Sequence, residues 1–245
     1  METVAIVIPT LNEERSIAKV IDGVPVIDLL RNGLETAVYV IDGQSTDNTR
    51  QIAVEKGATI IPEERKGKGS AVQTAFNSID ADYAIMVDGD NTYPMSAALE
   101  MLRLLHTYDV VIGSRLKGTI EPGAMTKLNV AGNKLLSLLA RLLFGARISD
   151  VCTGLWAYRR DAIRRLDLEA RGFEIEADMF AECVRNGLRI AEIPITYSAR
   201  KDQAKLSSLR DGVKIGLFLC TRRLGLVKLS ESGRTELAKP TGGRD

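Results

Sequence analysis

The chain has very little histidine and cysteine for its 245 residues. A single histidine, His106, excludes metal sites built from several histidines. It lies in an apolar helix-like run, which disfavours a histidine general base. Its three cysteines, Cys152, Cys183 and Cys220, are not closely spaced. They predict neither a zinc ribbon nor a disulfide framework, and they favour a reducing compartment.

Long apolar runs are also missing. No stretch of about 18 uncharged apolar residues occurs, so we expect no membrane-spanning segment. The first ten residues lack the basic leader and cleavage site of a signal peptide. Aromatic residues make up only 5% of the chain and do not interleave with the basic ones, so we expect no nucleic-acid partner. The polar residues 230–245 are expected to form a flexible tail.

The near-neutral formal charge of +1 hides an uneven distribution. Residues 1–113 carry 9 basic and 17 acidic side chains, whereas residues 114–245 carry 24 basic and 15 acidic ones. An acidic front half and a basic second half indicate two different kinds of charged partner.

Apolar runs alternate with helical patterns in the first half of the chain. Runs typical of buried parallel strands occur at 3–9, 36–42, 58–62, 82–88 and 109–113. Helical patterns lie between them, at 13–31, 47–56, 69–79 and 95–107. This alternation predicts an α/β fold, doubly wound, with a mostly parallel sheet and flanking helices.

The second half has a different pattern. A Gly/Pro-containing loop at 116–124 precedes a Leu-rich helix predicted at 125–147, whose charged residues are all basic. An apolar run, two helices and a strand are predicted next, at 151–159, 160–167, 174–186 and 188–198. A basic amphipathic helix is predicted at 207–228.

Polar residues follow the ends of several predicted strands. Because ligands of doubly wound folds bind at the carboxyl ends of the strands, these side chains are expected to converge on one edge of the sheet. They are Asn12, Glu13, Asp42, Asp88, Asp90, Ser114 and Arg115.

Asp88 and Asp90 form an Asp-x-Asp pair in VDGDNTYP. Two carboxylates at one strand end can bind a hard divalent cation such as Mg²⁺ or Mn²⁺, which would neutralise a diphosphate leaving group. The alternative is a polar turn after a buried strand. The neighbouring strand-end residues Glu13 and Asp42 favour the metal site.

Two loops have both a ligand-binding and a structural interpretation. KGKGSA at 66–71 could direct backbone N–H groups of the loop, including that of Gly69, to a phosphate or sugar, or it could be a flexible basic loop. Asp42 could contact a base or ribose, or form a turn, and Asp47 could cap the following helix.

Five motifs in the first half resemble inverting glycosyltransferases of family two, which have the GT-A fold. They are PTLNEE (9–14), VIDGQSTDNT (40–49), GKGSA (67–71), VDGDNTYP (87–94) and GSR (113–115). Three later segments, at 150–163, 172–179 and 188–208, resemble the branch of dolichyl-phosphate mannose synthases and related polyprenyl-phosphate sugar synthases. The resemblance covers about residues 3–225.

The resemblance, together with the strand-end pattern, implies roles for individual residues. Catalytic roles fall to Asp90, Arg115 and Asp150, and Asp88 with Asp90 would bind Mg²⁺ or Mn²⁺. Acceptor-phosphate contacts fall to Arg115, Lys127 and Asn133. Nucleotide-sugar contacts fall to Pro9, Leu11, Asn12, Glu13, Asp42, Lys68, Gly69, Asp88, Gly89, Arg200 and Lys205.

The chain departs from the family pattern at two positions. The usual Asp-Asp-Gly-Ser is Asp42-Gly43-Gln44-Ser45 here, so the second Asp is missing, and Thr92 stands where mannose synthases often have Gln. We expect one GT-A domain at 1–229, with a nucleotide-sugar half at 1–113 and an acceptor half at 114–229.

The implied reaction transfers a hexose from GDP-mannose or a UDP-sugar to a polyprenyl or dolichyl phosphate. Such a phosphate is already an anionic nucleophile, so a histidine-poor chain needs no general base. The helices at 125–147 and 207–228 could lie on an anionic membrane surface, giving a peripheral protein on the cytosolic face. Alternatively they cover the core, form a homodimer contact or meet a membrane partner subunit.

Two other functions stay open. One is a related transferase with a soluble or glycan acceptor. The other is a non-catalytic nucleotide-sugar-binding scaffold, which the intact Asp88 and Asp90 pair disfavours.

Overall fold

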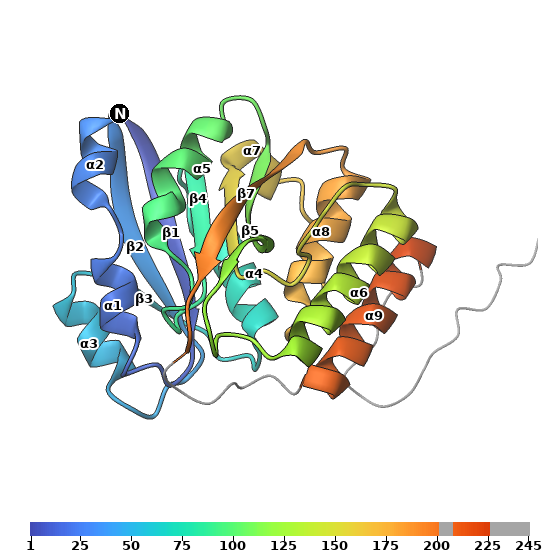
Figure 1. Cartoon of the computed structure of the whole chain (residues 1–245). Helices are drawn as coiled ribbons and strands as arrows, with labels where there is room; N and C mark the ends of the chain where they lie inside the picture. Colours follow the sequence, from blue (N-terminus) through green and yellow to red (C-terminus); the bar gives the residue numbers. More distant parts are fainter. Residues whose placement is uncertain (201–207, 226–245) are drawn as a thin grey trace, which may run out of the picture.

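The computed structural model describes residues 1–200 and 208–225. One seven-stranded mixed sheet has helices on both faces (Figure 1). Its strands are β1 (Glu2–Thr10), β2 (Leu34–Asp42), β3 (Thr59–Pro62), β4 (Tyr83–Val87), β5 (Val110–Ile120), β6 (Leu155–Arg159) and β7 (Ile190–Tyr197). The helices are α1 (Ile17–Asp22), α2 (Val26–Arg31), α3 (Thr49–Glu55), α4 (Lys68–Ser78), a 3-10 turn η1 (Met95–Ala97), α5 (Ala98–Leu104), α6 (Lys127–Phe144), α7 (Arg160–Ile163), α8 (Ile175–Arg185) and α9 (Ser208–Leu224).

The strand order is β3-β2-β1-β4-β6-β5-β7. All neighbouring pairs are parallel except that β6 runs antiparallel to both β4 and β5. The mostly parallel sheet that the sequence predicted is therefore confirmed. Because β6 is inserted between β4 and β5, one sheet continues through both halves of the chain.

Each face of the sheet has its own apolar core, because successive side chains of a strand point to opposite faces. Ile6 and Ile8 of β1 pack with α1 and α5 on one face, whereas Val7 packs with α4 on the other. Helices α6, α8 and α9 extend this second face, where Trp156 and Phe180 are completely buried.

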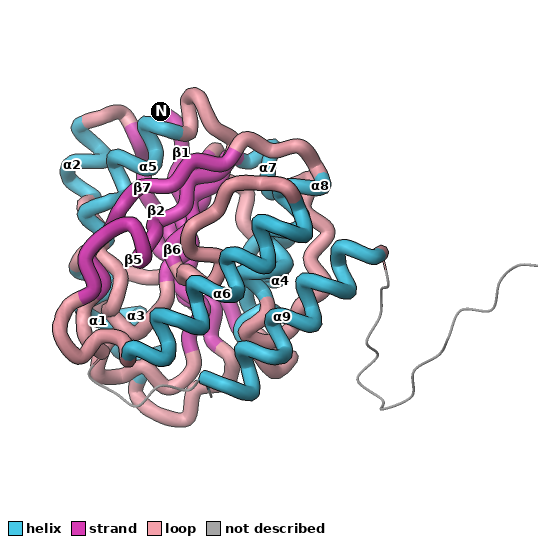
Figure 2. The backbone as a smooth tube through the Cα atoms, turned by 45° about the vertical axis from the view of Figure 1, so that its right-hand side comes forward, coloured by secondary structure: helices cyan, strands magenta, loops and turns pink. Residues whose placement is uncertain are grey.

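Helices α6 and α9 lie side by side and both contact α8 (Figure 2). The Thr126 side chain caps α6 by accepting from the N–H of Asn129 at 3.2 Å, and the helix ends at Gly145 with a left-handed φ of 68°. These signals shorten the helix predicted at 125–147 at both ends. The predicted tail at 230–245 lies outside the described residues.

Three predicted elements differ in the structure. The helix expected at 13–31 is two short helices, because Gly23 ends α1 and Pro25, which has no N–H, precedes α2. The helix expected at 160–167 is the single turn α7. Strand β5 continues into the expected loop at 116–124, because its end pairs with β7 beyond an irregularity between Ser114 and Thr119.

Candidate active site

The register of β1, β2 and β4 brings the polar residues that end or follow these strands to one edge of the sheet. Ser114 and Arg115, predicted to follow a strand, lie instead within β5, because this strand continues to Ile120. Thr10 of β1 is paired with Asp42 of β2, and Val7 of β1 is paired with Met86 of β4. Asp88 and Glu13 therefore follow strands that end at the same edge. This convergence is the arrangement that the sequence predicted.

The loop after β1 is tied to the loop after β2. Asn12 has a left-handed φ of 52°, its N–H donates to Ser45 Oγ at 2.9 Å, and its side-chain oxygen accepts from the N–H of Thr46 at 2.8 Å. Asp42 is buried and accepts from the N–H of Ser45 at 3.1 Å. Asn12 and Asp42 thus shape the two loops that bound this part of the edge.

Asp47 has a structural role, although the N-cap residue of α3 is Asn48 and Asp47 precedes it. Its carboxylate accepts from the N–H of Thr49, the first residue of α3, at 3.0 Å. Hydrogen bonds from Thr49 and from the backbone of Glu14 lower the pKa of Asp47, although burial acts in the opposite direction. Asp47 therefore stabilises the beginning of α3 as a carboxylate.

Four other residues predicted to contact the nucleotide sugar lie at or after the ends of β1 and β4. Glu13 is buried, its carboxylate accepts from Ser16 Oγ at 2.8 Å, and its N–H donates to Thr49 Oγ1 at 2.8 Å. Pro9 is buried, whereas the Leu11 side chain is 44% exposed at the edge. A Cβ atom at Gly89 would lie 3.3 Å from Thr10 Oγ1, so Gly89 packs closely on the end of β1.

Each aspartate of the Asp-x-Asp pair is paired with a basic side chain. Asp88 forms an ion pair with Lys68, the first residue of α4. Asp90 forms an ion pair with Arg200 and accepts from Thr92 Oγ1 at 2.6 Å. Lys205, the other basic residue predicted near the diphosphate, lies outside the described residues.

The pair has the chemistry of a site for a hard divalent cation. Both groups are carboxylates at one strand end, which are ligands that such a cation prefers. In this structure Lys68 and Arg200 occupy them, so a bound cation would compete with these two side chains. Gly154 leaves space for Asp88, because a Cβ atom at residue 154 would overlap the Asp88 carboxylate. Within residues 1–200 and 208–225, no group of three or more His, Cys, Asp or Glu side chains could hold a metal ion.

The glycine loop before α4 has a different role from the one expected. The N–H groups of Gly69 and Ser70 donate to the carbonyls of Gly172 and Arg171, both at 3.2 Å. A Cβ atom at Gly69 would overlap the carbonyl of Ala170. The expectation that the Gly69 N–H faces a phosphate is therefore wrong in this structure, because the loop needs glycine to pack against residues 170–172.

Lys68 has a second acidic partner that the sequence did not single out. Its ammonium also pairs with Glu176, which lies in the first turn of α8. Burial lowers the pKa of Lys68, but the charges of Asp88 and Glu176 outweigh it and the pKa is raised. Burial also raises the pKa of Glu176. The ammonium thus bridges two carboxylates.

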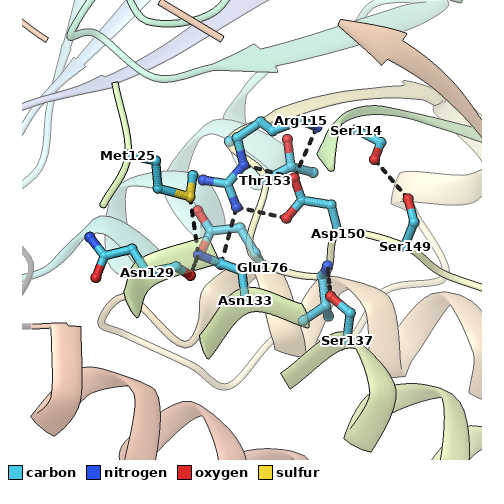
Figure 3. Close-up of polar contacts among 12 residues, drawn as sticks. Ser114, Arg115, Met125, Asn129, Asn133, Ser137, Ser149, Asp150, Thr153 and Glu176 are labelled. Carbon is cyan, nitrogen blue, oxygen red and sulfur yellow. Dashed lines mark hydrogen bonds and ion pairs between the residues drawn. The ribbon is translucent and has the colours of Figure 1, made fainter. Parts of the chain in front are cut away.

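Arg115 and Asp150 form a buried bidentate ion pair (Figure 3). Arg115 Nε lies 2.7 Å from Asp150 Oδ2, and Arg115 Nη2 lies 2.7 Å from Asp150 Oδ1. Nη2 also donates to the side-chain oxygen of Asn133 on α6 at 3.2 Å, and the guanidinium carbon lies 5.3 Å from the ring centroid of Tyr197. Three predicted residues are thus brought together. Lys127 is exposed, at the beginning of the same helix α6.

Tyr93 and Gly154 connect these two clusters and were not predicted as site residues. The buried Tyr93 hydroxyl accepts from the N–H of Gly154 at 2.7 Å, and the carbonyl of Gly154 accepts from the N–H of Asp88 at 3.2 Å. The Tyr93 ring also packs edge-on against Tyr197, which stacks with Arg115. For Gly154 the sequence signal is TGLW at 153–156, which lies both in the apolar run predicted at 151–159 and in a segment that carries the family resemblance.

A cavity of about 190 Å³ is lined by Asp90 of the Asp-x-Asp pair. It lies between α1, the turn after β4 and the residues after β7, and its lining includes Arg15, Lys19, Asp90, Tyr93 and Ser198. Two basic side chains therefore line the same space as Asp90. A cavity with this lining suits an anionic ligand.

The chain belongs to glycosyltransferase family 2, because the model of that family, "Glycosyl transferase family 2", matches residues 5–167. Glycosyltransferase AglJ of Haloferax volcanii is 38% identical over 225 residues, which cover 90% of this chain and 72% of that protein. A dolichyl-phosphate hexose transferase of the same organism is 36% identical over 217 residues, which cover 88% of this chain and 91% of that protein.

A solved structure agrees with the fold. Glucosyl-3-phosphoglycerate synthase from Mycobacterium tuberculosis, in complex with Mn²⁺, uridine diphosphate and glucosyl-3-phosphoglycerate, has a TM-score of 0.71 and is 25% identical. The match covers 95% of this chain and 82% of that one. The predicted GT-A fold and the predicted enzyme class, a hexosyltransferase, are confirmed.

Within residues 1–200 and 208–225, no helix is both long and apolar enough to cross a membrane.

Proposed function

We propose that this enzyme transfers a hexose from a nucleoside-diphosphate sugar to the phosphate of a polyprenyl or dolichyl phosphate, with inversion at the anomeric carbon. One observation carries the proposal. Two charged clusters, Lys68–Asp88 with Asp90–Arg200 and Arg115–Asp150 with Asn133, are joined through Gly154 and Tyr93 at one region of the sheet edge. A transfer between two phosphorylated molecules needs two such clusters.

The donor nucleoside would bind at the ends of β1 and β2. Asp42 offers a buried carboxylate, which can accept hydrogen bonds from N–H groups of a base or hydroxyls of a ribose. The exposed Leu11 offers apolar surface beside it, and Pro9, which is buried, would support the end of β1 from below. Asn12, Glu13 and Gly89 would hold the shape of this pocket through the contacts described above.

Asp88 and Asp90 would hold the Mg²⁺ or Mn²⁺ ion. When bound, the ion would supply positive charge that stabilises the leaving diphosphate. Lys68 and Arg200 would add their own charges on the donor side, since each already lies against one of the two aspartates. Lys205 is proposed to act with Arg200.

Arg115 would position the acceptor phosphate. Asp150 holds the guanidinium in a fixed orientation through two 2.7 Å contacts, and Asn133 fixes it from α6. Arginine suits this role because its charge is permanent and Nη1 is not the nitrogen that binds Asp150 or Asn133. Lys127 would add a second, solvent-accessible positive charge at the beginning of α6.

The reaction is a single displacement. An oxygen of the acceptor phosphate attacks the anomeric carbon and forms the new C–O bond. The bond from that carbon to the diphosphate oxygen breaks, and its electron pair leaves with the nucleoside diphosphate. No proton must be removed from the nucleophile, so the residues of the site need only bind and orient two anions.

A lipid acceptor is supported by the outer surface of α6 and α9. Exposed apolar residues of α6 recur along the helix, with Leu128, Leu135 and Leu142 at heptad spacing, and exposed apolar residues of α9 continue the surface on the neighbouring helix. They are Leu128, Leu135, Leu138 and Leu142 on α6, and Val213, Leu217 and Leu224 on α9. The exposed fractions of Leu135 and Leu142 are 66% and 75%. We call these seven residues the α6–α9 face.

Basic side chains flank the α6–α9 face. Lys127, Lys134 and Arg141 account for every charged residue of α6, and Lys214 is exposed on α9. Anionic lipid headgroups complement such a surface, whereas a second copy of this chain would bring like charges together. The protein is therefore proposed to sit peripherally on the cytosolic face of a membrane. A homodimer or a membrane partner subunit would contradict this use of the face.

The proposal is tested with a panel of donors. GDP-mannose, UDP-glucose and UDP-N-acetylglucosamine are each incubated with the enzyme, Mg²⁺ or Mn²⁺, and a short polyprenyl phosphate in detergent. Mass spectrometry scores the product lipid. The proposal expects one donor to give a hexosyl-phosphate lipid, and no lipid product with any donor would contradict it.

A further inference from the structure

Lys68 lies between two carboxylates that come from different parts of the fold. Asp88 follows β4, whereas Glu176 lies on α8, and the Lys68 ammonium pairs with one oxygen of each. The Lys68 side chain is only 13% exposed and that of Glu176 only 7%. The ammonium is therefore held between two acids and has little access to water.

This arrangement matters for the proposed metal site, on which the inference rests. A divalent cation bound by Asp88 needs the same carboxylate that the Lys68 ammonium now neutralises. Two positive groups on one carboxylate repel each other, and a buried ammonium without a counter-ion is strongly unfavourable. Binding of the cation therefore requires another anion for Lys68.

Glu176 is already in place to be that anion. It contacts Lys68 directly, and it belongs to the first turn of α8, where the helix dipole favours a carboxylate. A carboxylate as buried as this one is uncommon in a protein unless it has a charged partner.

We propose that Glu176 is a positioning residue that holds the Lys68 ammonium when Asp88 binds a divalent cation. Glu176 does not ligate the ion. It frees the Asp88 carboxylate, keeps the buried charge of Lys68 compensated, and leaves the ammonium beside the donor diphosphate. The Mn²⁺ affinity of the site is then set jointly by Asp88 and by the Lys68–Glu176 pair.

The test measures Mn²⁺ binding to the full chain by electron paramagnetic resonance, without donor or acceptor. Glu176→Gln removes the alternative partner of Lys68, so Mn²⁺ affinity is expected to fall by about tenfold or more. Lys68→Met removes the competing cation, and affinity is expected to rise by at least about threefold. Glu182→Gln, which changes another buried and ion-paired carboxylate of α8, is the matched control and should leave affinity unchanged.

The double variant Lys68→Met/Glu176→Gln separates an indirect role from ligation. If Glu176 acts through Lys68, its substitution has little effect once Lys68 is gone. An equal loss of affinity in both backgrounds would make Glu176 a metal ligand and overturn the proposal. An unchanged affinity of Glu176→Gln would also overturn it, as would a fall in affinity for Lys68→Met.

Asp88→Asn distinguishes a failure of the proposed metal site from a failure of the proposed role of Glu176. If the wild-type chain binds no Mn²⁺, or binds it equally well with Asn at residue 88, the proposed metal site itself is wrong and the role of Glu176 falls with it. If binding depends on Asp88 and the Glu176 variant behaves like wild type, only the inference fails. Should Glu176→Gln not fold, as judged by circular dichroism, the Lys68→Met result decides.

Discussion

Gly154 leaves the space in which the Asp88 carboxylate lies, because a Cβ atom at residue 154 would overlap it. The same glycine donates its N–H to the Tyr93 hydroxyl and accepts from the N–H of Asp88. The residue immediately before β6 therefore sets the position of a carboxylate that follows β4. This contact between the two halves of the chain makes Gly154 a test of the whole site.

Gly154→Ala is expected to displace the Asp88 carboxylate and lower turnover by about 100-fold, since catalytic groups tolerate little misplacement. Steady-state kinetics with the preferred donor measures the effect. Gly212→Ala is the control, because a Cβ atom there meets nothing within 4 Å and alanine favours the helix. Normal turnover of Gly154→Ala would contradict the role given to Asp88.

Asp88→Asn and Asp90→Asn are each expected to reduce metal-dependent turnover by about 100-fold or more, because the leaving diphosphate loses its counter-charge. Both variants keep the shape of the side chain. The measurement is initial rate against Mg²⁺ and Mn²⁺ concentration. Wild-type rates, or a full rate in the presence of a chelator, would show that the pair does not bind the ion.

Asp150→Asn breaks the buried ion pair with Arg115, which is expected to cost about 3–5 kcal/mol of stability because a guanidinium is left with weaker partners. Where the variant still folds, the KM for the acceptor should rise while donor affinity stays the same. Chemical unfolding and donor titration measure the two effects. A change confined to donor affinity would move Arg115 to the donor side.

The α6–α9 face predicts binding to anionic vesicles. Leu135→Glu with Leu217→Glu is expected to weaken co-sedimentation with phosphatidylglycerol-containing vesicles by about tenfold or more, since apolar contact is lost and two negative charges are added. Val54→Glu, at a 59% exposed position on α3, is the matched control. If the double variant changes the oligomeric state and leaves vesicle binding as it was, the face is a dimer contact.

Glu63, at the end of β3, predicts a dependence of stability on pH. Its carboxylate accepts from the side chains of Arg65 and Thr74, and the Arg65 hydrogen bond is the main reason that its pKa is lowered from 4.5 to about 2. Folding therefore favours the ionised form. Its contribution is complete above pH 4.5 and is lost as the pH falls through about 2.

Glu63→Gln should flatten this acid loss in a series of thermal unfolding curves. An unchanged acid slope would show that other carboxylates account for it.

The sequence predicted the polar edge of the sheet because a polar residue directly after a buried apolar run marks the end of a strand. Asp42 and Asp88 each follow a buried apolar run, and parallel strands bring such ends together. Glu176 could not be predicted in this way. It lies within a helix, and its role depends on Lys68, which is 108 residues away in the chain.

The glycine loop is a second case in which the sequence pattern did not predict the contacts. KGKGSA has the composition of an anion-binding loop, but the N–H groups of Gly69 and Ser70 donate to the carbonyls of Gly172 and Arg171. Likewise Pro25 divides a helix that hydrophobic periodicity alone extends from 13 to 31. In both cases a contact or a backbone restriction that the pattern does not contain decides the structure.

The central claim is that the hexose is transferred to the phosphate of a polyprenyl phosphate. The most direct measurement compares three acceptors with the preferred donor: a polyprenyl phosphate, the matching polyprenol without phosphate, and 3-phosphoglycerate. Nuclear magnetic resonance of the product reports the new carbon–oxygen–phosphorus linkage and its anomeric configuration. We expect an inverted linkage with the polyprenyl phosphate alone. A product with 3-phosphoglycerate but not with the lipid would contradict transfer to a lipid phosphate.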